Sequence, residues 1–361
     1  MDSNKSTEVS NLEEGDSEVQ YDMSVLPDEV IGIILSKLSW KDINKVKFVS
    51  KKLYGMIHKN YHKLERKKVQ ELSIRYYGDC RRYPFFIKIG VMAWENVGSD
   101  VPRYGPRTRI ERFKNGEELS NFLKTADLRC LNKLNIPAAR NIDIFTILNK
   151  SFQEGTNINT LNIVKLLEEN LNSFQTFIGK LSSVREIVIK RVCFHSAGSE
   201  DNCLLLSSLL LLNGIERLSI NECRKTNFLT ADMVTRLFKN KLNLVSLNIE
   251  TRSVEFVENV FKEFFKMEQP RKRDNKCDCN RVFLTIYFNG EYELLLDILR
   301  SNLNEVESVV EETDTSTPED VSFASNVDCK YCLRNKHIFS RYFVVWDNEF
   351  ASAHRRKFNF P

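Results

Sequence analysis

The feature that most constrains the fold is a short apolar pattern, Leu-x-x-Leu-x-Leu, that recurs between residues 131 and 288. Its first copy is Leu131-Asn-Lys-Leu134-Asn-Ile136. Further copies are Ile158/Leu161/Ile163, Val184/Ile187/Ile189, Ile215/Leu218/Ile220 and Leu244/Leu247/Ile249, with a weaker one at Phe283/Ile286/Phe288. The central residues of the first five copies are 26 to 31 residues apart. Each copy therefore predicts a strand with one apolar face, repeated at a nearly regular interval.

Amphipathic stretches, such as 173–181, 230–239 and 255–266, lie between the copies and predict helices. The last has a wide apolar stripe of Phe256, Val257, Val260, Phe261, Phe264 and Phe265. The repeat length is near the upper end of the leucine-rich-repeat range. For residues 65–361 we therefore expect an irregular leucine-rich-repeat-like α/β solenoid, in which each strand–helix unit buries its apolar face against its neighbours. The alternative is an ordinary α/β sandwich with the same order of elements.

Two stretches have little to bury and are expected to be disordered. Residues 1–22 are polar and acidic. The second stretch, about 304–328, carries Glu305, Glu311 and Glu312, then Ser, Thr and Pro318, and we expect it to loop out of the folded region. After it, the run 341–346 is rich in aromatic and branched residues and predicts a terminal strand or hairpin that closes the end of the sheet.

Residues 23–64 have a different, helical pattern. Pro27 suits the first turn of a helix, and Asp28 and Glu29 suit its positive end. Apolar residues then follow at helical spacing: Val30, Ile31, Ile33, Ile34, Leu35 and Leu38. Ser39 is a candidate cap of a second helix, with Asp42 three residues on. Three short helices fit this spacing. So small a module buries few side chains internally, so its surplus of apolar residues predicts a partner over one face.

The same run resembles the F-box. The matching positions are the Leu26-Pro27 start with Glu29, then Ile34, Leu35 and Leu38, then Asp42-Ile43, and the closing Val49-Ser50-Lys51-Lys52. Leu53 departs from the family, in which many members have Trp at this position. The remainder of the chain is similar in texture, and in its ending at 343–346, to the F-box-associated region of the expanded nematode F-box families.

The resemblance implies a docking role without catalysis. F-box helices bind the Skp adaptor, which binds the cullin scaffold of a ubiquitin ligase, and the C-terminal domain would select the protein client. The implied Skp-binding residues are Leu26, Pro27, Ile31, Ile34, Leu35 and Leu38, with Ile43, Val46, Val49 and Leu53 shared between the core of the module and the interface. An adaptor of this kind could lead its client to degradation or only sequester it. The competing hypothesis is a non-degradative repeat scaffold whose N-terminal helices only cap the solenoid.

Composition and motifs argue against several other classes of protein, including nucleic-acid-binding proteins, membrane proteins and enzymes. The formal net charge of +4 is too small to imply a nucleic-acid partner. No apolar run reaches the length of a membrane span, and the N-terminus is not a signal peptide, so a cytoplasmic or nuclear protein is expected. No phosphate loop or nucleophile motif is present, so we expect neither an enzyme nor a cofactor. Cys277, Cys279, Cys329 and Cys332 invite a zinc hypothesis, but free thiols are favoured because the first pair is separated by one residue.

Overall fold

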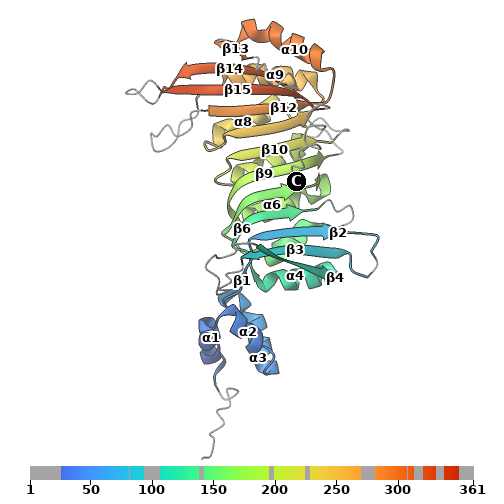
Figure 1. Cartoon of the computed structure of the whole chain (residues 1–361), viewed down its shortest axis with the longest axis vertical. Coiled ribbons are helices and arrows are strands. Elements are labelled where there is room, and N and C mark those ends of the chain that lie inside the picture. Colours follow the sequence, from blue (N-terminus) through green and yellow to red (C-terminus); the bar gives the residue numbers. More distant parts are fainter. Residues whose placement is uncertain are drawn as a thin grey trace, which may run out of the picture. The chain divides into compact units, whose positions relative to one another are not determined.

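A computed structural model of the chain describes residues 26–80, 82–92, 106–137, 142–194, 199–223, 228–269, 281–306, 308–312, 320–330 and 337–348 (Figure 1). The chain divides into two compact units, Met1–Arg66 and Lys67–Pro361. This division falls two residues after the end of the helical module predicted at 64. The tail predicted at 1–22 lies outside the described residues.

The first unit contains three helices, α1 (Asp28–Lys37), α2 (Trp40–Val46) and α3 (Lys51–Asn60), followed by a 3-10 turn at Tyr61–Lys63. Serine side chains begin the second and third helices. Ser39 Oγ accepts a hydrogen bond from the backbone N–H of Asp42 at 3.3 Å, and Ser50 Oγ accepts one from Leu53 at 3.2 Å. The predicted cap at Ser39 is therefore confirmed. Pro27 precedes α1 as its N-cap instead of occupying the first turn.

The second unit is built on one large sheet. The described residues form 13 strands in the order β13-β14-β15-β12-β11-β10-β9-β7-β6-β2-β3-β4, with β8 (Leu166–Leu167) beside β9. Parallel pairing joins β2 (Glu71–Tyr76), β6 (Cys130–Ile136), β7 (Thr156–Ile163), β9 (Leu181–Cys193), β10 (Arg217–Glu222), β11 (Ser246–Thr251), β12 (Arg281–Phe288) and β15 (Ile338–Asp347). Antiparallel pairing adds β3 (Phe85–Met92) and β4 (Pro106–Phe113) at one end, and β14 (Asp320–Asp328) and β13 (Val309–Glu312) at the other. A separate pair joins β1 (Lys67–Lys68) to β5 (Ala126–Asp127).

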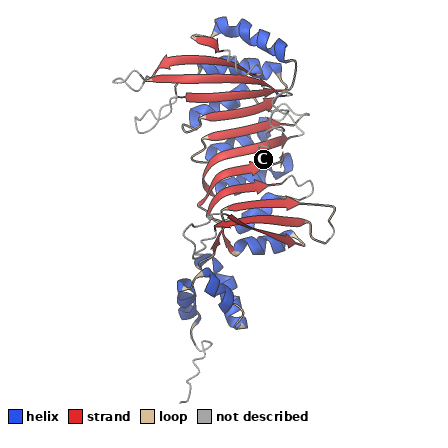
Figure 2. Cartoon of the chain, viewed as in Figure 1, coloured by secondary structure: helices blue, strands red, loops and turns tan. Residues whose placement is uncertain are grey.

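Helices alternate with most of these strands and pack on one face of the sheet. In the view of Figure 2 most of these helices lie behind the strands. They are α4 (Gly116–Lys124), α5 (Ile144–Ser151), α6 (Leu171–Gly179), α7 (Ser199–Leu211), α8 (Ala231–Asn240), α9 (Val254–Lys266) and α10 (Tyr292–Ser301), with 3-10 turns at Glu168–Asn170 and Asn302–Glu305. The helices predicted at 173–181, 230–239 and 255–266 correspond to α6, α8 and α9. The predicted aromatic stripe of α9 is wholly buried.

The repeated apolar pattern forms the core between sheet and helices. In the first five copies every first, fourth and sixth residue is at most 3% exposed. A bulge explains how residues three apart reach the same side of a strand. Asn132 and Lys133 both donate their backbone N–H to the carbonyl of Gln70, at 2.7 and 3.1 Å, and Val245 and Ser246 do the same to Glu216, at 2.8 and 3.1 Å. Two residues thus oppose one at these points, and both intervening side chains turn away from the helices.

Two lysine side chains form hydrogen bonds between successive helices. Lys180, the C-cap of α6, donates from Nζ to the carbonyl of Asn149 near the end of α5, at 2.5 Å. Lys241, the C-cap of α8, donates to the carbonyl of Leu210 near the end of α7, at 2.6 Å. A cation at the C-terminus of a helix satisfies carbonyls that have no partner within the helix and complements its dipole.

Three predictions about the C-terminal third are corrected. The sixth copy of the pattern contains no bulge, so strict alternation turns Phe283 away from the core and buries Val282 and Leu284 instead. The stretch at about 304–328 contains the strands β13 and β14, because β14 pairs with β15 along nine residue pairs; residues 313–319 lie outside the described residues. The predicted terminal strand, β15, lies between β12 and β14, so β13 forms that edge of the sheet.

Candidate functional site

The core of the first unit holds its three helices against one another. Ile31 and Leu35 of α1 are 0% exposed and pack with Ile43 of α2 and Leu53 of α3. The same cluster includes Met56, Ile57 and Leu64. A link across the module reinforces it, since Lys52 Nζ lies 3.5 Å from Asp28 Oδ1 and donates to the carbonyl of Leu26 at 3.2 Å. The module is therefore a packed three-helix unit with its own small core.

Apolar side chains remain on the outside of this unit. On α1, Val30 is 40% and Ile33 is 62% exposed. Between α2 and α3, Phe48 is 79% and Val49 is 74% exposed. The module leaves much of the surface of these side chains in water, and this forfeits the stabilisation that burial gives. Exposed apolar residues gathered on so small a unit are typical of a protein interaction surface.

The ten predicted Skp-binding residues fall into three groups. Pro27 and Val49 are exposed, Leu26, Ile34, Leu38 and Val46 are half-buried, and Ile31, Leu35, Ile43 and Leu53 are buried in the module core. Adaptor contact by Ile31 and Leu35 stays a prediction, and in this packing the side chains of both residues are 0% exposed. Sequence reasoning missed Val30, Ile33 and Phe48 as exposed residues. The sequence feature that could have indicated them is the number of apolar residues in this module, which is larger than one buried helical stripe requires.

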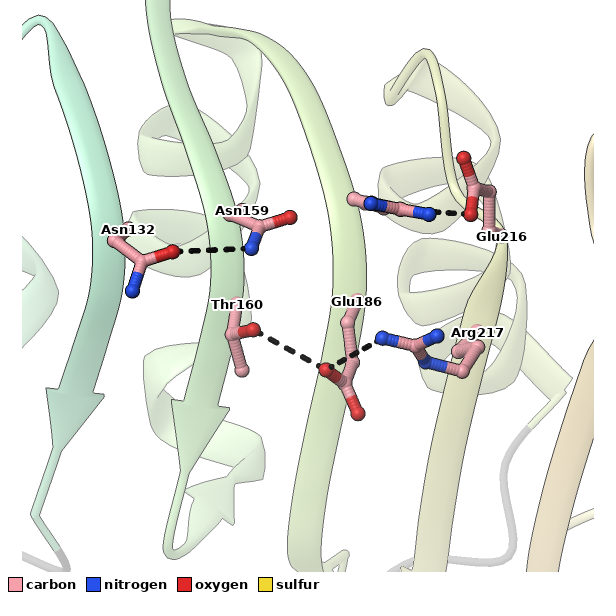
Figure 3. A network of polar contacts seen from close by, with 7 residues as sticks. Asn132, Asn159, Thr160, Glu186, Glu216 and Arg217 are labelled. Atoms are coloured by element: carbon pink, nitrogen blue, oxygen red, sulfur yellow. Dashed lines mark hydrogen bonds and ion pairs between the residues drawn. The ribbon is translucent and has the colours of Figure 1, made fainter.

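The second unit presents a polar face on the side of the sheet opposite its helices. Because the bulges turn two side chains outward on each strand, polar ladders run across β6, β7, β9 and β10 (Figure 3). In the first ladder, Asn159 Nδ2 donates to Asn132 Oδ1 at 3.1 Å, and Arg185 Nε donates to Glu216 Oε2 at 2.7 Å. The side chains are thus fixed by one another across neighbouring strands.

A second ladder runs beside the first. Glu186 Oε2 accepts from Thr160 Oγ1 at 3.2 Å and from Arg217 at 3.3 Å. Further along the same strands Asn162 Nδ2 donates to Asn135 Oδ1 at 2.8 Å. In this middle part of the sheet Arg185 pairs with Glu216 and Arg217 pairs with Glu186, so these charges are matched within the surface.

A shallow cleft of about 610 Å³ lies over the first ladder. Its lining includes Gln70, Asn132, Asn159 and Arg185. The second amide atoms of the two asparagines, which the ladder bond leaves available, are the groups that hydrogen-bond to peptide or other amides. The cleft can therefore hold a polar ligand by hydrogen bonds, with fixed side chains and balanced charge.

The described part of the chain offers neither a metal site nor a membrane-spanning helix. No group of three or more His, Cys, Asp or Glu there is placed to hold a metal ion. Of the cysteines in the zinc hypothesis, Cys277, Cys279 and Cys332 lie outside the described residues, and Cys329 is a buried thiol within 3.3 Å of Gln269 Nε2. No helix in the described ranges is long and apolar enough to cross a membrane.

Comparison with known families identifies the first unit. Residues 23–64 match the family model of the F-box domain, which has the bounds predicted from the sequence. A search of curated proteins finds no match to the chain. The F-box domain supports, in general terms, a role as a substrate adaptor in an SCF-type ligase. F-box domains generally bind the Skp adaptor, and the proteins that carry them are generally not enzymes.

Proposed function

We propose that this chain is a substrate-recognition adaptor of an SCF-type cullin ubiquitin ligase, with the Skp adaptor bound to the first unit and a protein client to the second. The observation that carries the proposal is the F-box match at residues 23–64, in a module that leaves large apolar side chains exposed. No side chain of this module needs to do chemistry in such a role, because transfer of ubiquitin takes place elsewhere in the complex.

The docking residues follow from exposure. The exposed contacts come from two places: Pro27, Val30 and Ile33 at α1, and Phe48 and Val49 before α3. The half-buried positions at the edge of the core, Leu26, Ile34, Leu38 and Val46, complete the surface. Ile31, Leu35, Ile43 and Leu53 act from the core by fixing the helices that carry these contacts. A few large apolar anchors of this kind can dominate the affinity of an interface.

The second unit is proposed to hold the client. We interpret its alternation of parallel strands and helices, with a step of 26 to 31 residues, as an irregular leucine-rich-repeat-like solenoid. In such repeat folds the sheet face free of helices is the usual binding surface. The fixed polar ladders and the cleft over them make this face the proposed client-binding surface. The proposed partners place the protein in the cytoplasm or the nucleus, where the bound client would be ubiquitylated and degraded.

A pulldown of the Skp adaptor by the full chain tests the proposal. We expect the wild type to capture the adaptor and Ile33→Glu/Val49→Glu to lose most of it, because a charge at an apolar interface is desolvated without a partner. Both residues are exposed, so the substitutions leave the module core intact.

Leu294→Glu/Val310→Glu is the matched control, since these residues of the second unit are 50% and 57% exposed. It should capture as much adaptor as the wild type. If the wild type fails to bind, the adaptor function is wrong and the chain is a scaffold whose first unit has another role. If both double variants bind equally well, the docking residues are misassigned.

A further inference from the structure

One part of the open sheet face carries three cations that strand register brings together. At the end of the sheet formed by β2, β3 and β4, alternation along the strands places Arg75, Lys88 and Arg112 on the side opposite the buried Ile74, Ile87 and Phe113. All three are exposed. We call these three cations the basic patch.

Strand register brings the basic patch together around one aromatic ring. Phe86 of β3 pairs with Arg75 of β2 on one side and with Arg112 of β4 on the other. Lys88 follows two residues along β3 and therefore projects from the same face. The guanidinium of Arg112 lies over the Phe86 ring, 5.3 Å from its centroid, and Tyr77 meets the same ring edge-on at 5.2 Å.

The basic patch has no internal counter-charge. None of its three cations forms an ion pair with a residue in the described ranges, whereas in the middle of the sheet Arg185 pairs with Glu216 and Arg217 with Glu186. The acid that β2 presents on this face, Glu71, lies opposite Gly90, further along the strands. Like charges on neighbouring strands repel and destabilise a sheet. Their grouping here is explained if a ligand supplies the negative charge.

We propose that the basic patch is the docking site for an acidic segment of the client protein. Arginine forks bind carboxylates through paired hydrogen bonds, and the Phe86–Tyr77 rings give apolar contact to the stems of Asp and Glu side chains. Three cations suit a short peptide, whereas a protein that makes about 6–10 phosphate contacts with DNA uses more cations than the basic patch holds. The inference rests on the proposed adaptor function only in naming the ligand a client.

Binding of a fluorescein-labelled oligoglutamate peptide to the full-length protein, followed by anisotropy at low salt, tests this assignment. We expect saturable binding to the wild type and a loss of roughly tenfold or more in affinity for Arg75→Gln/Lys88→Gln/Arg112→Gln. The control Lys150→Gln/Lys239→Gln/Lys266→Gln removes the same charge from exposed positions on α5, α8 and α9 and should change the affinity less than about twofold. Lys88→Glu alone, at an exposed site, provides the same test if the triple variant does not fold.

Four results would overturn the proposal: no saturable binding to the wild type, equal losses in the two triple variants, equal affinity for an oligoglutamine peptide of the same length, or tighter binding of single-stranded RNA than of the peptide. A rise in affinity on deletion of residues 1–22 would also overturn it, because the acidic tail of the chain would then be the ligand. The assay contains no Skp adaptor. Failure of peptide binding with intact adaptor capture therefore rejects the basic patch alone, and the reverse result rejects the adaptor function alone.

Discussion

Glu222 at the end of β10 accepts a hydrogen bond from the Thr251 hydroxyl at the end of β11, with 2.8 Å between Oε2 and Oγ1. Its other oxygen, Oε1, accepts from the backbone N–H groups of Phe228 and Leu229, each at 2.9 Å. The carboxylate therefore fastens the segment that leads into α8 to the sheet. Phe228 and Leu229 are buried, so their N–H groups have no water to replace this partner.

We predict that Glu222→Ala lowers the free energy of unfolding by about 1–3 kcal/mol, because two buried N–H groups lose their acceptor. Glu222→Gln should stay within about 1 kcal/mol of the wild type, since its amide oxygen can accept from both N–H groups and its amide nitrogen can donate to Thr251. Urea denaturation of the full chain measures both values. Equal losses in the two variants would show that the negative charge, and not the acceptor, is required.

The Glu222 carboxyl should also make the free energy of unfolding depend on pH. Burial raises the pKa of Glu222 above its ordinary value of 4.5, against the lowering effect of its three hydrogen bonds. The folded state therefore binds the proton more tightly than the unfolded state. This contribution to stability is complete below about pH 4.5 and is lost as the pH rises through the raised pKa.

The stability of the wild type relative to Glu222→Gln should accordingly fall as the pH is raised from 4.5, as measured by urea denaturation at a series of pH values. Because all other groups titrate in both proteins, the difference in free energy of unfolding between wild type and Glu222→Gln reports on Glu222 alone. A relative stability that rises with pH over this range would mean that the hydrogen bonds outweigh burial and that the sign assigned to the shift is wrong.

Two residues of α1 should have different roles: Leu35 stabilises the helical module, whereas Ile33 is proposed to contact the adaptor. Leu35→Ala should cost about 2–5 kcal/mol, because Leu35 is fully buried in a small core. Ile33→Ala should cost much less, since Ile33 is 62% exposed. Hydrogen exchange of the amides in α1, α2 and α3 measures the difference. We expect faster exchange throughout the module in Leu35→Ala and near wild-type rates in Ile33→Ala. Fast exchange in both would place Ile33 in the core.

Much of this architecture follows from local patterns in the sequence. The Leu-x-x-Leu-x-Leu copies located β6, β7, β9, β10 and β11, because an apolar residue at each of the three positions requires one buried strand face. The serine cap and the apolar spacing indicated the three helices of the F-box. In both cases the deciding contacts lie within a few residues of one another along the chain.

Features that depend on distant residues were not predicted. Lys180 reaches the end of α5 from 31 residues away, and nothing local to Lys180 marks this contact. The acidic stretch at 304–328 reads as disordered, but pairing with β15 supplies order that composition cannot show. Likewise, the F-box resemblance implied that Ile31 and Leu35 contact the adaptor, but only the packing of the three helices shows that both side chains turn into the module core.

The thiols of the sheet should differ in reactivity. Cys193 at the end of β9 is buried, and burial, followed by a hydrogen bond with Cys223, raises its pKa to about 11. Only the thiolate attacks iodoacetamide, and the raised pKa leaves little Cys193 thiolate at pH 8. Cys130 is exposed at the start of β6. We predict that native protein is alkylated at least about tenfold more slowly at Cys193 than at Cys130, as followed by peptide mass spectrometry. Unfolding in urea should remove the difference, because both the burial and the contact with Cys223 are lost. Equal rates in the native protein would show that the end of β9 opens to solvent on the timescale of the reaction.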